Sequence, residues 1–423
     1  MVNFKLALKS GGIVKVGVKT KVLFESATDC SFEKLVDNSN KKTKQINNNQ
    51  KTHKVLHFEN PSYIIGRKSI VSKKEAEGPI GKYFDQVQED AKYGQKNFEL
   101  AEISFLQDSI MGAIRDAGLI LSDIDMMMSG DLLNQLTTSN FVARNLGLPF
   151  LGLYSACSSM SQALLLGTVM IDGGHAGHIV CGVSSHFASA ERQFRMPLEY
   201  GGQKPPYSQW TVTGAGSSVL SNRPKYDSTN VSKEYISNIK SSKNDNSNIK
   251  SSKADTSDIE SSKAENKNIK ITKGVIGTTI DMGTHDIANM GAAMAPAFLH
   301  SLVSFLKETE TSASDYDLIV SGDLGKLGSD IARTVALEQG IKLGQNYIDC
   351  GAIMYNNFQN AYQGGSGCAC SATAINSFVL PKIQDGTYKK VLYLATGALM
   401  SPQSTFQGES IPCISHGVLF EAE

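Results

Sequence analysis

An internal duplication constrains the fold of this chain more than any other feature of its sequence. The stretch DIDMMMSGDLLNQ (residues 123–135) is similar to DYDLIVSGDLGKL (residues 315–327), and each is a short apolar run that ends in Ser-Gly-Asp-Leu. We interpret each as a buried strand that leads into a loop. Similar segments surround both motifs in the same order, so the sequence predicts two similar halves.

Helical and extended patterns alternate around the two motifs. Each half holds a helix, the motif strand, a turn of small residues with cysteine that opens a second helix, and a further strand: residues 97–119, 123–135, 149–174 and 178–186, then 287–309, 315–327, 346–386 and 390–400. Strands that alternate with helices predict parallel-type α/β halves. We expect these halves to pack about a pseudo-two-fold axis, with a pocket near their junction.

Two polar segments interrupt this plan, one at residues 37–54 and one at residues 226–273. The second repeats a decapeptide, with NIKSSK at 238 and 248, DIESSK at 258 and NIKITK at 268. One isoleucine per repeat cannot bury an apolar face, so we expect a loosely structured surface insert; an amphipathic partner-binding repeat is the alternative. The predicted organisation is an N-terminal extension, a first half, the insert and a second half, at residues 1–54, 55–225, 226–273 and 274–423.

Composition excludes several functional classes. Lys and Arg together number 41, as do Asp and Glu, so no net charge points to nucleic acid. Seven cysteines in 423 residues do not make a disulfide framework, which favours a reducing compartment. No run approaches the roughly eighteen apolar residues of a membrane span, and the N-terminus lacks the apolar block of a signal peptide. We therefore expect a soluble chain.

Cys157 stands where an apolar extended run gives way to a helical one, in LYSACSSMSQALLLG. A thiol at a helix start is a candidate nucleophile, because the helix N-terminus favours a thiolate and can hold an oxyanion. It is equally suited to be a binding group or a small residue in a tight turn.

Two such halves, with a cysteine at the start of a buried helix in the first, resemble the thiolase superfamily of thiolases and ketoacyl synthases. The resemblance implies an α/β, thiolase-like fold in which two pseudo-symmetric α/β halves form a layered αβαβα arrangement. More narrowly, the likeness from about Val55 to Glu421, apart from the insert, is to the stage V sporulation protein AD family of spore-forming bacteria. The segments that carry it are GDLLNQ, SACSSM, SSHFASAERQFRMPLEYGGQKP, TVTGAGSSVLS, GGSGCACSA and ESIPCISHGVLFE.

Condensing enzymes of the superfamily pair this cysteine with two His, or with His and Asn, from the second half. By position the first partner falls on Gly322, or on Asp323 if the register shifts by one, and the second falls on Ser366. Neither position offers an imidazole, and a carboxylate beside a thiol raises the pKa of that thiol. We therefore expect a pocket that binds without catalysis. The alternatives are an active acyltransferase or condensing enzyme that uses Cys157, with Asp323 or His416 as partner, and a scaffold whose pocket is occluded.

The family resemblance implies a ligand, dipicolinic acid, alone or as its calcium complex, and a role in moving it through a membrane channel complex. The helix N-terminus after Ser155 would face a carboxylate of this ligand. Arg192 and Arg195 are three apart and would reach it together if their segment is helical. A structural tie from these arginines to Glu191 or Glu199 is the alternative.

Four further polar residues are candidates to bind the ligand. His186 closes a strand at the end where α/β folds bind ligands, and its alternative is a core histidine. Asp131 and Asp323 hold matching places in the two motifs and would ligate calcium carried by the ligand, unless each caps the turn that follows. Asn134 is a weaker candidate, as is the neighbouring Gln135.

The remaining cysteine motifs favour packing. Cys413 in PCISHG resembles a second thiolase cysteine, but Ser415 replaces the glycine that follows in thiolases, so packing of a small thiol is the alternative to catalysis. The CAC of residues 368–370 lacks the second cysteine pair of a zinc site, so we expect it to pack a buried helix. We expect no resident metal or cofactor.

Assembly is implied by the resemblance alone. It implies a homodimer, other subunits of the stage V A channel complex as partners, and a place in the spore at the inner membrane through those partners. Nothing in the sequence favours a nucleic-acid partner.

Overall fold

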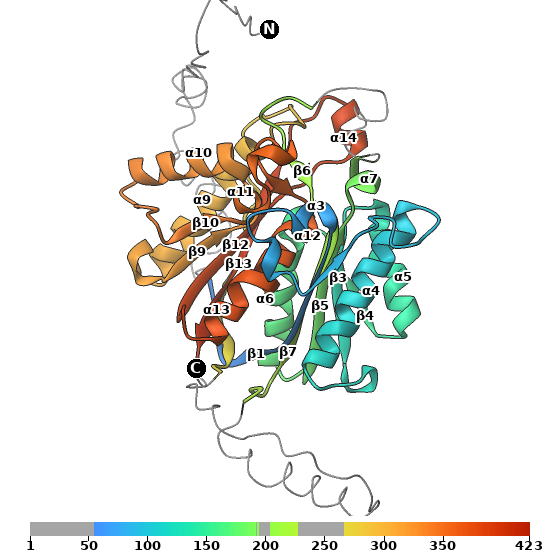
Figure 1. Ribbon diagram of the computed structural model, residues 1–423. Helices are drawn as coiled ribbons and strands as arrows, with labels where there is room; N and C mark the ends of the chain where they lie inside the picture. Colours follow the sequence, from blue (N-terminus) through green and yellow to red (C-terminus); the bar gives the residue numbers. More distant parts are fainter. Residues whose placement is uncertain (1–54, 192, 194–203, 227–265) are drawn as a thin grey trace, which may run out of the picture. The chain divides into compact units, whose positions relative to one another are not determined.

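The computed structural model describes residues 55–191, 193, 204–226 and 266–423 (Figure 1), and all structural statements below refer to them. The described strands pair into one large mixed sheet and a small two-stranded one. The large sheet has the order β10-β9-β12-β13-β8-β1-β7-β5-β3-β4, and β2 pairs with β1 off this path. The small sheet joins β6 to β11 in parallel.

The first half supplies one flank of the large sheet. Its strands are β1 (Val55–Ser72), β2 (Gln86–Gln88), β3 (Met126–Gly130), β4 (Phe150–Gly152), β5 (His178–Ser185), β6 (Trp210–Thr211) and β7 (Gly214–Ser221). Its helices and 3-10 turns are α3 (Lys73–Ala76), η1 (Gly81–Tyr83), α4 (Phe98–Asp116), η2 (Leu121–Asp123), η3 (Asn134–Leu136), α5 (Thr137–Leu146), η4 (Ala156–Ser158), α6 (Ser159–Asp172) and α7 (Phe187–Ala190).

The second half supplies the other flank. Its strands are β8 (Ile269–Val275), β9 (Leu318–Ser321), β10 (Tyr347–Asp349), β11 (Gly365–Ser366), β12 (Lys390–Ala398) and β13 (Cys413–Ala422). Its helical elements are α9 (Met290–Glu308), η6 (Ala313–Asp315), α10 (Gly325–Glu338), α11 (Cys350–Met354), η7 (Asn357–Gln359), α12 (Cys368–Ala374), the π-helical η8 (Ile375–Val379), α13 (Leu380–Gln384) and α14 (Pro402–Phe406).

The strand order confirms the predicted duplication. From the edge inward, the first half runs β4-β3-β5-β7-β1 and the second runs β10-β9-β12-β13-β8, so equivalent strands hold equivalent places. The long strand β1 joins the halves, because it pairs in antiparallel fashion with β7 on one side and β8 on the other. The helices and strands expected around the two motifs are present as α4, β3 and β5, and as α9, β9 and β12.

Strand alternation builds three apolar cores, which give the layered arrangement. On β12, Val391 and Tyr393 point into the central core and Leu392 and Leu394 into an outer core, because successive side chains of a strand face opposite ways. The central core surrounds α6 and α12, whereas the outer cores lie under α4 and α9. Figure 1 shows α4 and α5 on one side, α9 and α10 on the other, and α6 and α12 between them.

One predicted boundary is wrong. The last decapeptide copy, NIKITK at residues 268–273, was expected in the surface insert, but most of it forms β8 in the middle of the sheet. Ile269 and Ile271 are fully or almost fully buried in the central core. Two isoleucines in strand alternation bury a face that the single isoleucine of the other copies cannot bury.

Candidate functional site

A small pocket lies between the halves, where the starts of α6 and α12 meet the ends of β6 and β12. Its volume is about 30 Å³, and both halves contribute to its walls. Most of the side chains that line it are apolar, and the hydroxyls of Tyr154, Thr211 and Ser366 are the polar exceptions beside the Cys157 thiol. The lining residues are Leu132, Tyr154, Ala156, Cys157, Ala190, Thr211, Met290, Ser366, Gly367, Ala398 and Met400.

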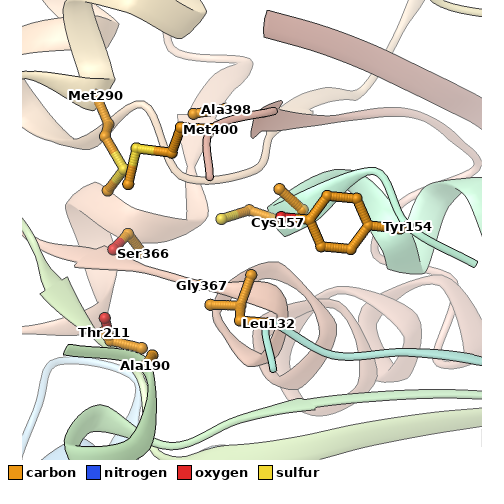
Figure 2. Close-up of a pocket in the computed structure, with 11 residues that line it drawn as sticks. Leu132, Tyr154, Cys157, Ala190, Thr211, Met290, Ser366, Gly367, Ala398 and Met400 are labelled. Atoms are coloured by element: carbon orange, nitrogen blue, oxygen red, sulfur yellow. The ribbon is translucent and has the colours of Figure 1, made fainter. Parts of the chain in front are cut away.

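Cys157 forms part of the pocket floor. It lies in η4, at the start of the helical run that continues as α6, and only 5% of its surface is exposed. Its sulfur points into the space that Met290, Met400 and Ser366 border (Figure 2). The residue before it, Ala156, has a left-handed backbone (φ 49°), which turns the chain sharply from β4 into the helix.

The thiol of Cys157 lies close enough to the carboxyl group of Asp323 for the two to influence each other's ionisation. Burial raises the pKa of Cys157 well above its ordinary value, and the nearby Asp323 raises this pKa further. A cysteine is a nucleophile as its thiolate, so these surroundings keep the side chain unreactive.

Asp323 follows β9 and is completely buried. Its Oδ1 accepts a hydrogen bond from Thr396 Oγ1 (2.9 Å), and its Oδ2 accepts one from the Gly367 N–H (3.2 Å). Burial raises the pKa of Asp323 to about 7, and the neighbouring Asp349 adds to the rise. Of the two positions predicted for the first catalytic partner, Asp323 therefore brings the side chain to the thiol, whereas Gly322 has none.

Asp349, at the end of β10, explains why the Asp323 side chain bonds Gly367 of the pocket wall instead of its own turn. The Asp349 carboxylate accepts hydrogen bonds from the backbone N–H groups of Leu324 (2.9 Å), Gly325 (2.8 Å) and Ala352 (2.9 Å). It thus satisfies the turn that follows Asp323. The Asp323 side chain is left to bond Thr396 and Gly367 instead.

Asp131, the matching residue of the first half, is arranged differently. Its carboxylate accepts hydrogen bonds from the Leu133 N–H (2.9 Å), the Ser139 N–H (2.8 Å) and the Ser139 hydroxyl (2.7 Å). It is absent from the pocket lining, so its geometry corresponds to the turn-capping alternative. Burial raises the pKa of Asp131, as it does that of Glu102, whose pKa the charge of Asp131 raises further.

His186 is a packed core histidine in this structure. Its Nε2 lies 2.8 Å from the Ala91 carbonyl oxygen, and its Nδ1 accepts a hydrogen bond from the Ala188 N–H (3.2 Å). Its ring lies against Phe98, with 5.1 Å between the ring centroids. Burial lowers the pKa of His186, which favours the neutral ring. It does not line the pocket.

The other predicted ligand-binding residues fall in three places. Ser366 lies in β11, is completely buried and lines the pocket, as its predicted match to the second catalytic partner requires. Asn134 is exposed in η3, and its backbone N–H donates to Gln193 Oε1 (3.0 Å), away from the pocket lining. Arg192 and Arg195 lie outside the described residues.

The remaining cysteine candidates are all buried. The thiol of Cys368 contacts the Ala156 carbonyl oxygen at 3.0 Å and packs α12 against η4. Burial raises the pKa of Cys413 to about 12, and burial lowers the pKa of His416 to about 4. The His416 Nδ1 accepts a hydrogen bond from the Gly277 N–H (3.2 Å). Within the described residues no cluster of His, Cys, Asp or Glu has the geometry to hold a metal ion.

Sequence reasoning missed most of the pocket wall. Met290, Met400 and Leu132 are apolar residues at element ends, and nothing in their local pattern separates them from core residues. Thr396 donates a hydrogen bond to Asp323, but the sequence predicts only that this residue lies in a strand. Gly397, the next residue, allows β12 to approach η4, because a Cβ there would lie 2.0 Å from the Ser155 carbonyl oxygen.

Comparisons with known proteins give the family and the fold. A family model described as Stage V sporulation protein AD matches residues 52–421. The stage V sporulation protein AD of Bacillus subtilis (strain 168) is 36% identical over 364 residues, which are 86% of this chain and 95% of that protein.

Two structures of OleA from Xanthomonas campestris have TM-scores of 0.50 at 12% and 11% identity. They cover 86% and 87% of this chain and 99% and 100% of their own chains. At such low identity the likeness shows the fold alone. This likeness confirms the expected α/β thiolase-like fold. In the part of the chain that the structure describes, no helix is long and apolar enough to cross a bilayer.

Proposed function

This chain belongs to the stage V sporulation protein AD family, and from that premise we propose that it binds dipicolinic acid, free or as its calcium complex, in the pocket beside Cys157. It is thus a sporulation protein with a thiolase-like fold, and its proposed task is to support uptake of this ligand into the developing spore. The proposal includes a place in a membrane channel complex, reached through the other subunits of that complex.

One observation carries the proposal of binding in place of catalysis. The Cys157 thiol faces the carboxyl group of Asp323, and among the described residues no His, Lys or Arg lines the pocket. Acyl transfer to a cysteine requires a thiolate, and the enolate chemistry of a condensing enzyme requires donors such as imidazole. Asp323 opposes the thiolate, so the pocket keeps the position of a nucleophile without its chemistry.

The pocket offers complementary groups for a flat aromatic dicarboxylate. The N-terminus of the helical run η4–α6 favours a carboxylate, and the pocket wall adds the polar side chains of Ser366 and of Thr211, whose hydroxyl donates to Glu191 Oε1 (3.4 Å). The side chains of Leu132, Met290 and Met400 form apolar walls for the ring. The side chains of Met290 and Met400 are flexible, so these walls can adjust to the shape of the ring.

The proposed homodimer would form through β4. This strand pairs with β3 on one side only, and 46% of the surface of its Leu151 is exposed. At the opposite edge of the sheet, the Arg333 guanidinium donates to the Tyr347 carbonyl oxygen of β10 (2.9 Å). Because β10 is covered by this side chain and β4 is open, two copies of the chain would pair through β4.

Titration calorimetry with dipicolinate, with and without calcium, tests the proposed ligand. The only tryptophan of the chain, Trp210, is adjacent to the pocket residue Thr211, so its fluorescence is a second readout. We expect saturable binding by the wild type and by Cys157→Ala, because the thiol takes no part in covalent chemistry. Thr211→Val should weaken binding by about five- to tenfold, whereas the exposed Thr387→Val should not.

Two outcomes would count against the proposal. Absence of dipicolinate binding in both calorimetry and fluorescence would contradict the proposed ligand. A mass increase on Cys157 after incubation with an acyl-CoA would instead support the acyltransferase alternative.

A further inference from the structure

We propose that Asp323 couples ligand binding to protonation, so that a dicarboxylate bound over the N-terminus of α6 is held together with one proton on this buried carboxyl group. This inference rests on the proposed function, since it concerns the regulation of the same pocket. It assigns to Asp323 a role as a proton-linked residue behind the pocket floor.

The geometry places Asp323 directly behind two lining residues. Its Oδ2 accepts a hydrogen bond from the Gly367 N–H at 3.2 Å, and its charge acts on the Cys157 thiol; both of these residues line the pocket. On its far side Thr396 Oγ1 donates to Oδ1 at 2.9 Å. Asp349 fixes the turn after Asp323, so the carboxyl group has a defined place directly behind the pocket wall.

The groups that face Asp323 are neutral or become negative when they ionise. They are the thiols of Cys157, Cys350, Cys368, Cys370 and Cys413, the carboxyl group of Asp349 and the phenol of Tyr393, contributed by η4, α11, α12, β13, β10 and β12. Within the described part of the chain, no cation is among them. The pKa of Asp323, raised to about 7 chiefly by burial, is what such surroundings produce.

A bound dianion adds negative charge on the pocket side of this carboxyl group. Because the interior screens charge poorly, the ligand disfavours the carboxylate form of Asp323 and raises the pH at which it loses its proton. Coupling is reciprocal, so proton loss from Asp323 must weaken ligand binding to the same extent. Because burial raises the pKa of Asp323 to about 7, a ligand that raises it further draws a proton onto this carboxyl group near and above neutral pH.

Calorimetric titration of the full-length protein with dipicolinate tests the inference. At pH 8, titrations in two buffers with different ionisation enthalpies should show uptake of about 0.5 to 1 proton per bound ligand. The Kd should rise by about five- to tenfold between pH 7.5 and 8.5, where the ligand itself is fully ionised. Asp323→Asn should bind without proton uptake and with a Kd that does not change over this range.

Asp317→Asn is the matched control, because Asp317 is exposed at the other end of β9 and should leave proton uptake unchanged. Binding by the wild type without proton uptake would overturn the inference and leave the proposed function standing. Absence of dipicolinate binding at every pH would instead overturn the proposed function. If Asp323→Asn does not fold, the two-buffer measurement on the wild type decides alone.

Discussion

Gly152 and Asp349 occupy equivalent positions in the two halves, because Gly152 pairs with Ser129 across β4 and β3 as Asp349 pairs with Ser321 across β10 and β9. In the second half the Asp349 carboxylate accepts the hydrogen bonds of the turn after β9, and Asp323 bonds Thr396 and the lining residue Gly367. In the first half glycine has no side chain to do this, and Asp131 bonds the turn itself. One difference between repeats thus makes the pocket floor asymmetric.

Removing the Asp349 carboxylate should destabilise the protein strongly. Asp349→Ala leaves the Leu324, Gly325 and Ala352 N–H groups and the Ser321 hydroxyl without their buried acceptor. We expect a loss of about 3–5 kcal/mol in the free energy of unfolding, measured by urea denaturation. Asp349→Asn keeps one acceptor oxygen, so its loss in the free energy of unfolding should be clearly smaller than that of Asp349→Ala. Equal losses in the two variants would show that the hydrogen bonds do not hold this turn.

Asp323→Asn should change how stability depends on pH. The pKa of Asp323 is about 7 in the folded protein and near 3.8 when unfolded, so the folded state holds a proton that the unfolded state releases. Its contribution to stability is complete below pH 4 and is lost as the pH rises through about 7. Between pH 5 and pH 7, the free energy of unfolding of the variant should therefore rise relative to that of the wild type by on the order of 1 kcal/mol per pH unit.

Urea denaturation followed by circular dichroism at several pH values measures this difference, with Asp317→Asn as the control. A difference between variant and wild type that stays constant with pH would contradict the raised pKa of Asp323.

Cys157 should react slowly with iodoacetamide. Its pKa is raised by burial and by Asp323, so we expect alkylation on the order of a hundredfold slower than that of an exposed cysteine. Asp323→Asn removes the neighbouring negative charge and should speed the reaction by about tenfold. Peptide mass spectrometry measures both rates, and the protein in urea is the reference for full reactivity. Rapid alkylation of the folded wild type would revive the nucleophile interpretation.

Deletion of residues 228–264 should leave the fold intact. The backbone N–H of Tyr226 donates to Asn268 Oδ1 (2.9 Å), and Asn268 Nδ2 donates to the Tyr226 carbonyl oxygen (2.8 Å), so the two ends of the segment are already joined. A short glycine-serine linker can replace it, and a shorter loop costs less closure entropy. We expect the Tm to change by less than about 3 °C in a thermal melt. Loss of the folding transition would show that the segment contributes to the core.

Gly397→Ala should disturb the contact between the halves. The new Cβ would lie 2.0 Å from the Ser155 carbonyl oxygen, and neither β12 nor η4 can move freely. We expect a loss of about 2–4 kcal/mol in the free energy of unfolding by urea denaturation. At Gly177 a Cβ meets nothing closer than Asp125 Oδ2 at 3.6 Å, so Gly177→Ala should change stability by less than about 0.5 kcal/mol. Similar effects of both substitutions would refute the close approach.

The sequence alone determined the repeated architecture, because apolar periodicity and turn residues are local signals. The two Ser-Gly-Asp-Leu motifs marked β3 and β9, and the flanking patterns marked α4, β5, α9 and β12. The same signals put Cys157 at a helix start, and the resemblance to condensing enzymes limited its predicted partners to Gly322, Asp323 and Ser366. The periodicity failed at residues 268–273, where two isoleucines in alternation form β8 instead of a further repeat.

Only the tertiary structure decided which of the two equivalent aspartates lies directly behind the pocket floor, bonded to the lining residue Gly367. Asp131 and Asp323 are each the third residue of an identical Ser-Gly-Asp-Leu tetrapeptide, so no local pattern separates them. Their orientation depends on the residue that the neighbouring edge strand places beside them, Gly152 in one case and Asp349 in the other. Hydrogen-bond partners and charges that come from distant strands meet only after folding, and they set the pKa of Asp323 and Cys157.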